Sequence, residues 1–205
     1  QGLVFQENRA TGDRRISGTT AALCGLDRAV DIADHIAADV ALRRILLSYS
    51  IVAGWGGIPV VWSGDELAAP NDRHWADNPL HADDNRWVHR PALDWERARF
   101  RHDTATPIGH VFSALARLAR TRARLPQLHA GTPTEVLEVR DPGVLATVRR
   151  HPYGAMVMLA NVTASPRPWP SWRIRELGVG DPVDAITGDR PPEDGNGDFW
   201  VPPQT

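Results

Sequence analysis

A short segment, residues 83–87, places an arginine beside two carboxylates and an indole. It reads Asp83-Asp84-Asn85-Arg86-Trp87. The planar guanidinium of Arg86 carries five N–H donors, so it could bind sugar hydroxyls and a carboxylate together, which an ammonium group does poorly. Asp83 and Asp84 are better suited to orienting the arginine or bonding the loop than to catalysis. Taken alone, the segment fits an exposed loop ion pair at least as well.

Other polar groups of the chain are poorer candidates for chemistry. Asp65 and Glu66 are adjacent, and adjacent side chains of an extended segment point opposite ways, so this pair would not easily flank one bond. His74, His81 and His89 are spaced seven and eight residues apart, which fits no compact metal-ligand motif. We therefore expect no metal site and no cofactor.

The elements that must position residues 83–87 read as one α/β unit. Apolar residues recur at helical spacing from about Asp31, and a cluster of glycines ends that helix. Ile58–Trp62 is a short apolar run that predicts a strand buried on both faces, as in parallel sheets covered by helices. A long polar loop over 63–107 follows, then a predicted helix over 108–124. In a barrel of such units the active site lies at the carboxyl ends of the strands, which indicates this loop.

The sequence after Pro126 predicts an antiparallel β-sandwich. Short apolar runs alternate with turns that contain Gly or Pro, and we expect a hairpin across Asp141-Pro142-Gly143. The predicted strands are Glu135–Arg140, Val144–Arg150, Ala155–Asn161, Val183–Ile186 and Asp198–Val201. Residues 1–26, rich in Gly, Thr, Arg and Asn, predict an irregular loop instead.

Composition argues against several classes of function. The 205 residues carry a formal net charge of −2, so we expect no nucleic acid and no anionic membrane surface as a partner. No apolar run reaches the roughly 18 residues of a membrane span. The single cysteine, Cys24, allows no internal disulfide, and with no secretory signal in view this favours a cytoplasmic protein. The start at Gln1 has no Met and no element signal, which suggests a fragment.

Three segments together resemble one enzyme family. Gly57–Glu66 resembles the eighth-strand motif of the α-amylase superfamily (glycoside hydrolase family 13), a Gly-x-Pro followed shortly by Gly-x-Glu. Arg9–Leu26 resembles the end of the loop domain that amylosucrases insert after strand seven, and Ala82–Pro91 resembles their loop-eight signature. All three occur in the family's order with similar spacing, and the resemblance covers about residues 8–125.

This resemblance implies a fold and a domain layout. The chain would be α/β, the C-terminal end of a (β/α)8 barrel followed by an antiparallel β-sandwich. Residues 1–26 would end the loop-seven insertion. Residues 27–125 would form the last helix, strand, loop eight and final helix of the barrel, and 126–205 the C-terminal domain.

The function implied is that of a sucrose-acting retaining glucosyltransferase, which passes glucose from sucrose to an α-glucan or to water. In the family the catalytic carboxylates follow earlier strands, so we expect no catalytic residue here and no turnover by this chain alone. The resemblance makes Arg86 a ligand of the glucosyl subsite that pairs with an upstream acid, with Asp84 beside it. Arg15 would line the acceptor or fructosyl side. The expected partners are sucrose, an α-glucan and the missing N-terminal part of the barrel.

Three alternatives remain open. A sucrose hydrolase, or a sucrose- or trehalose-isomerising relative, would share these motifs because such enzymes differ mostly in upstream acceptor loops. A non-catalytic carbohydrate-binding protein could use Trp169 and Trp172 as a stacking platform, although we favour the interpretation that the two residues cap the sandwich. A truncated, inactive gene product is the third.

Overall fold

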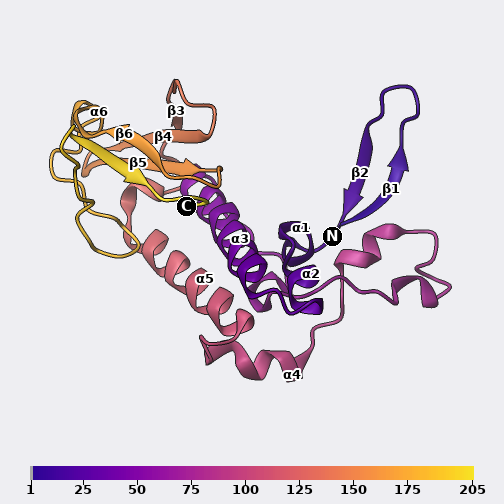
Figure 1. The fold of residues 1–205 in the computed structure, drawn as a ribbon. Coiled ribbons are helices and arrows are strands. Elements are labelled where there is room, and N and C mark those ends of the chain that lie inside the picture. Colours follow the sequence, from indigo (N-terminus) through magenta and orange to yellow (C-terminus); the bar gives the residue numbers. More distant parts are fainter. Residues whose placement is uncertain (1) are drawn as a thin grey trace. The chain divides into compact units, whose positions relative to one another are not determined.

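We analysed a computed structural model of the protein, which describes residues 2–205 (Figure 1). The chain divides into two compact units. The first unit comprises residues up to Ile45 together with Val61–Ala114. The second unit comprises Leu46–Val60 and Leu115–Thr205.

Two long helices contribute residues to both units, α3 (His35–Trp55) and α5 (Pro107–Arg124). Both match predicted helices, except that α3 begins later than expected. Ala33 has a φ of 54°, which breaks the chain away from the preceding turn, and the Asp34 carboxylate accepts the Ala37 N–H at 2.9 Å as an N-terminal cap. None of the helices in residues 2–205 combines the length and apolar character needed to span a membrane.

The start of the first unit is regular where the sequence predicts an irregular loop. Strands β1 (Leu3–Glu7) and β2 (Arg14–Ser17) form an antiparallel hairpin, and two short helices follow, α1 (Thr20–Cys24) and α2 (Leu26–Asp31). The prediction for residues 1–26 was therefore wrong over most of this range. The hairpin is exposed at nearly every position, so it lacks the alternation of apolar and polar residues that marks a half-buried strand.

The long segment after residue 62 contains only short helical turns. These are η1 (Asp65–Leu67), η2 (Trp75–Asp77), η3 (Asn85–His89), α4 (Trp95–Ala98) and η4 (Arg99–His102). A small apolar cluster of Leu67, Ala98, Ile108 and Phe112 joins the two ends of this segment. Most of the segment depends on polar contacts instead.

The predicted strand at Ile58–Trp62 is not formed. No strand or bridge is assigned to these residues, and among residues 2–205 no chain segment pairs with them. Their side chains are exposed rather than buried on two faces, with Ile58 85% exposed. The physical reason is that a strand exists only through neighbours that satisfy its N–H and C=O groups, and the described residues supply none.

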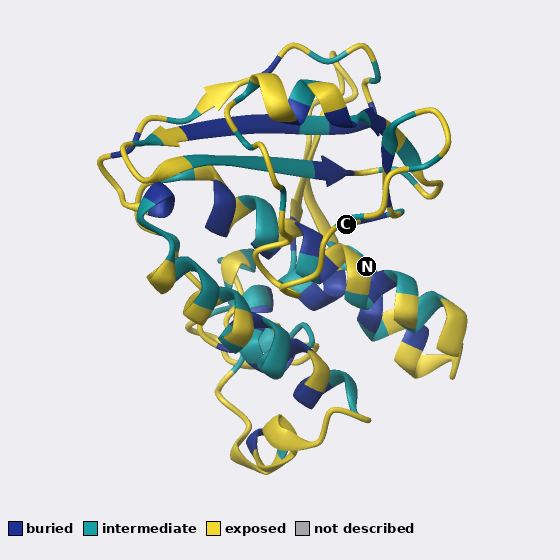
Figure 2. Cartoon of the chain, turned by 90° about the vertical axis from the view of Figure 1, so that its left-hand side faces the viewer, coloured by how far each residue is buried: buried dark blue, intermediate teal, exposed yellow. Residues whose placement is uncertain are grey.

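The second unit contains two small antiparallel sheets that share one apolar core. The three-stranded sheet is β3 (Glu135–Val136), β4 (Val144–His151) and β5 (Gly154–Asn161), and the two-stranded sheet is β6 (Arg167–Pro170) and β7 (Asp198–Val201). Helix α6 (Ser171–Glu176) and η5 (Pro126–Leu128) complete the unit. Val144, Ala146 and Val148 of β4 pack with Trp169 and Phe199, which lie on the other sheet. Figure 2 shows buried residues concentrated in the strands of this unit.

The β-sandwich prediction is supported only in part. Antiparallel sheets are present, and the predicted strands at 144–150, 155–161 and 198–201 agree with the structure within a residue or two. Val183–Ile186 forms no strand, and the strand predicted over 135–140 stops at Val136. The chain does reverse through Asp141-Pro142-Gly143, where the Val144 N–H donates to the Asp141 carbonyl at 3.1 Å. Two sheets of three and two strands do not establish a full sandwich.

The second unit is held together by a buried arginine, Arg149 on β4. Its side chain donates to the backbone carbonyls of Trp55, Gln127 and His129, each at 2.7 Å, and it is 1% exposed. Burial lowers the pKa of this guanidinium, yet it remains charged because arginine starts so high. The Trp55 carbonyl belongs to the last turn of α3, where carbonyls have no donor within the helix, and it also accepts the hydroxyl of Thr134. A Cβ at Gly56 would lie 2.0 Å from Arg149 Nη1, so the glycine makes this approach possible.

Replacing Arg149 by methionine should destabilise the protein strongly. Arg149→Met keeps an unbranched side chain but removes one donor from each of three carbonyls, and only those of Trp55 and His129 keep a second one, so we expect a loss of about 2–4 kcal/mol in the free energy of unfolding. Urea denaturation followed by circular dichroism measures the change. The matched control is Arg140→Met, an exposed arginine, for which a change within about 0.5 kcal/mol is expected. Equal effects of the two variants would contradict the role given to Arg149.

Candidate substrate-binding site in the loop after residue 62

The loop that carries the candidate residues is fixed at its start by two carboxylates. Glu66 Oε2 accepts the N–H of Gly64 at 2.8 Å, and Gly64 has a φ of 99° that favours glycine. Asp65 is 6% exposed, and its carboxylate accepts the hydroxyl of Thr20 at 2.6 Å and the Thr20 N–H at 3.4 Å. The two carboxylates thus serve different partners and do not face one bond, in agreement with the sequence-based expectation.

Further along, Asn71 and Arg97 attach the loop to the same unit. Asn71 Oδ1 accepts the Thr19 N–H at 2.8 Å, and the Asn71 N–H donates to the carboxylate of Asp27 at 3.0 Å. Arg97 donates to the carbonyls of Leu67 and Ala68 at 3.4 and 3.1 Å. The N-terminal turns of α1 and α2 therefore form hydrogen bonds with the loop, and these bonds fix the path of the loop near Asn71.

Arg86 and Asp84 form a two-point ion pair at the start of η3. Arg86 donates from Nε and Nη2 to the two Asp84 oxygens, both at 2.7 Å, and the Arg86 N–H donates to Asp84 Oδ1 at 3.0 Å. This hydrogen bond lowers the pKa of Asp84 from 3.8 to about 2, and it raises the pKa of Arg86. The Arg86 side chain is 64% exposed against 29% for Asp84. The Asp84 carboxylate is therefore the more buried partner, and the Arg86 guanidinium faces outward with no hydrogen bond from Nη1 to the described residues.

Arg15 lies on the exposed hairpin and forms no ion pair among residues 2–205. It stands opposite Gln6 in the register of β1 and β2, whereas its neighbour Arg14 pairs with Glu7 at 3.1 Å. Strand β2 contacts η3, the turn that carries Arg86. The structure thus brings the segments of Arg15 and Arg86 into the same neighbourhood, although the two side chains share no bond.

Aromatic rings pack around the same turn. His81 stacks on Trp87 with ring centroids 3.7 Å apart, and the Arg90 guanidinium lies 5.7 Å from the Trp87 ring. Trp62 meets His89 edge to face at 6.3 Å. Trp87 is thereby occupied by packing contacts. Trp62 remains half exposed at the end of the predicted barrel strand.

His89 is a residue that the sequence reasoning missed, since it was considered only as a metal ligand. Its Nδ1 is buried without a hydrogen-bond partner in the described residues. Burial, followed by the charge of Arg90, lowers the pKa of His89, so the imidazole is neutral near pH 7. In a 3-10 turn, side chains three residues apart eclipse, so His89 and Arg86 start from one face of η3. The three-residue spacing of Arg86 and His89 was the feature of the sequence that could have pointed to His89. Within residues 2–205, no group of three or more His, Cys, Asp or Glu could hold a metal ion.

Comparison with known proteins identifies the fold. No protein-family model matches the sequence. The structure resembles AmyP in complex with maltotriose, with a TM-score of 0.60 and 15% identity over 80% of this chain and 33% of that chain. It also resembles a cyclic α-maltosyl-(1→6)-maltose hydrolase from Arthrobacter globiformis, with a TM-score of 0.54 and 18% identity over 82% and 30% of the two chains. A third similar structure is the trehalulose synthase MutB of Pseudomonas mesoacidophila, with a TM-score of 0.52 and 14% identity over 78% and 37%.

These similar structures are enzymes of the α-amylase superfamily, and the chain shares their fold over most of its length. At such identities the likeness concerns the fold alone. The chain spans roughly a third of the length of the structures it matches. A mutant of the trehalulose synthase has been solved with its substrate sucrose.

The Asp84–Arg86 pair should be visible in the titration of Asp84. We expect a carboxyl pKa of about 2 by carbon-detected NMR. Because the folded pKa is lowered, the contribution of the pair is fully present above about pH 4 and is lost as the pH falls towards 2. In Arg86→Ala the pKa should return towards 3.8, whereas Arg90→Ala should leave most of the shift in place. Titration of Asp84 near 3.8 in the unchanged chain would show that the pair does not form in solution.

Proposed function

We propose that this chain acts as the C-terminal part of a sucrose-acting retaining glucosyltransferase of the amylosucrase type. The observation that carries the proposal is the Asp84–Arg86 pair, which presents a sugar-binding guanidinium from the loop after Ile58–Trp62. Three family-like segments and a fold shared with α-amylase-superfamily enzymes support it.

In this proposal, Arg86 is the sugar-binding cation and Asp84 determines its direction. Asp84 engages Nε and Nη2, which leaves Nη1 free to donate to a sugar hydroxyl without breaking the pair. A carboxylate from an upstream strand could bind the same outward edge and close the glucosyl pocket. Arg15 would line the acceptor or fructosyl side, because β2 contacts η3.

The chemistry itself would come from groups elsewhere in the whole enzyme. In the first step, one carboxylate attacks the anomeric carbon of sucrose while a carboxylic acid protonates the departing fructosyl oxygen. In the second step, the residue that gave this proton takes one from the acceptor hydroxyl, and the acceptor oxygen displaces the first carboxylate from the glucosyl carbon. These two groups lie about 5–5.5 Å apart in retaining enzymes. The proposed partners of this chain are accordingly sucrose, an α-glucan acceptor and the remaining part of the barrel.

A sucrose-isomerising enzyme is the second candidate, because a trehalulose synthase is among the similar structures. Such an enzyme would use the same Arg86 and would differ in how it handles the fructosyl unit. Analysis of the products of the complete enzyme separates the candidates. An α-glucan indicates transfer, free glucose indicates hydrolysis, and an isomer of sucrose indicates isomerisation.

The structure does not contain the tryptophan platform on which the carbohydrate-binding alternative was based. Trp169 is buried in the core of the second unit, with the Arg173 guanidinium 4.9 Å from its ring, while Trp172 is exposed. The two indoles therefore do not form one exposed platform. Trp169 instead lies in the apolar core.

Arg86→Ala in the complete enzyme should reduce kcat/KM for sucrose by about a hundredfold, or roughly 2.7 kcal/mol of transition-state stabilisation. The reason is the loss of a charge-assisted hydrogen bond to the glucosyl unit. Release of fructose from sucrose measures the effect. The matched control is Arg99→Ala, another exposed arginine with a carboxylate partner, Glu96 at 2.8 Å, for which no change is expected. Unchanged sucrose turnover in Arg86→Ala would refute the proposed role.

A further inference from the structure

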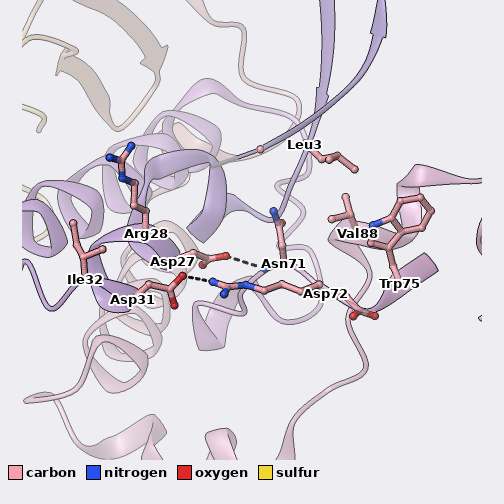
Figure 3. A pocket seen from close by; sticks show the side chains of 11 residues that line it. Leu3, Asp27, Arg28, Asp31, Ile32, Asn71, Asp72, Trp75 and Val88 are labelled. Atoms are coloured by element: carbon pink, nitrogen blue, oxygen red, sulfur yellow. Dashed lines mark hydrogen bonds and ion pairs between the residues drawn. The ribbon is translucent and has the colours of Figure 1, made fainter. Parts of the chain in front are cut away.

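The first unit contains a hollow that does not involve Arg86. It has a volume of about 450 Å³ and lies among the base of the β1–β2 hairpin, helix α2 and the start of the loop after residue 62 (Figure 3). This volume is within the range of small-molecule pockets. All lining residues belong to the first unit, so the hollow is a feature of this chain by itself.

Three carboxylates line the hollow, and each commits one oxygen to the protein. Asp27 Oδ2 accepts the Asn71 N–H at 3.0 Å, Asp31 Oδ2 pairs with Arg73, and Asp72 Oδ1 accepts the His74 N–H at 2.8 Å. No described residue donates to the second oxygen of any of the three. Each carboxylate is thus held in place by one oxygen and has the other available as an acceptor, an arrangement suited to hydroxyl donors.

The other part of the lining is apolar. The indole of Trp75, carried on η2, lies beside Val88, and Leu3 is drawn on the same side of the hollow (Figure 3). A flat aromatic face of this kind can pack against the C–H face of a pyranose ring. Figure 3 shows Asp27 and Asp31 apart from the indole and Asp72 on the same side as Trp75, so carboxylate acceptors and an aromatic face both line the hollow. A sugar carries hydroxyls at its rim and C–H groups on its faces, so it could use both.

The charge of the lining favours a neutral ligand. Three carboxylates and two guanidinium groups, Arg28 and Arg73, leave a formal charge of only −1, so neither an anion nor a cation gains a strong net attraction. A second hollow of about 670 Å³ shares five lining residues with the first, Asp27, Asp31, Asn71, Asp72 and Arg73. The Asp31–Arg73 pair therefore lines both hollows.

We propose that this hollow is an oligosaccharide-binding site, separate from Arg86, that holds an α-glucan through Trp75 and the free carboxylate oxygens of Asp27, Asp31 and Asp72. The choice of an α-glucan as the sugar rests on the proposed function; the site itself rests on the lining. The glucan bound there would be a chain that the enzyme extends, held near the loop that carries Arg86.

The test is titration of the complete chain with maltotriose, measured by isothermal calorimetry and by saturation-transfer NMR. We expect binding, and Trp75→Ala should raise the Kd at least about tenfold because it removes the stacking surface. Asp72→Asn is the second variant, since it retains the Oδ1 that accepts the His74 N–H and changes only the free oxygen. It should raise the Kd severalfold while leaving the circular dichroism spectrum unchanged.

Two controls test whether the effect is specific to the hollow. Trp95→Ala removes an exposed indole outside the hollow, and Arg99→Ala removes an exposed guanidinium outside it; neither should change the Kd of maltotriose. Absence of binding to a folded chain would overturn the proposal, and so would a loss of binding in Arg86→Ala but not in Trp75→Ala. The role of Arg86 in sucrose turnover would stand in the first case. Binding that depends on Trp75 and not on Trp95 or Arg99 supports the site, whatever the enzyme does with sucrose.

Discussion

The position of the candidate site depends on polar bonds between the loop after residue 62 and the first turn of α1. This loop buries few of its apolar side chains, and Asp65 and Asn71 attach it by accepting N–H groups from Thr20 and Thr19. The same bonds satisfy donors that the start of a helix leaves without partners. The loop and the helix therefore stabilise each other, and these bonds help to fix the position of the turn that carries Arg86. The proposed oligosaccharide site uses the same attachment, because Asp27 binds the Asn71 N–H.

Much of the fold could be predicted because its elements carry local signals. Helices α3 and α5 follow from apolar spacing, and β4, β5 and β7 follow from apolar runs between turns. The β1–β2 hairpin could not be predicted in this way, since its residues are exposed on both faces and give no periodicity. The prediction of a strand at Ile58–Trp62 was wrong for the opposite reason. Its local apolar pattern is strong, but a strand forms only beside partner strands, which a local pattern does not supply.

The candidate site was only partly accessible from the sequence. Asp84 and Arg86 are two residues apart, so their pairing is a local property that residue types suggest. The approach of β2 to η3, which brings the segment of Arg15 near Arg86, joins residues about 70 positions apart and had no signal beyond the family resemblance. His89 was overlooked because its significance lies in a buried, unpaired nitrogen, and burial at a single loop position cannot be read from residue types.

The account requires that exposed Ile58–Trp62 become a strand between neighbours, with the sugar bound at its carboxyl end. The most direct measurement is an experimental structure of the complete enzyme with sucrose. It should show Ile58–Trp62 in parallel pairing on both edges, and Arg86 Nη1 within hydrogen-bond distance of the glucosyl unit. Antiparallel pairing of this segment, or a sugar bound at its amino end away from Arg86, would contradict the account.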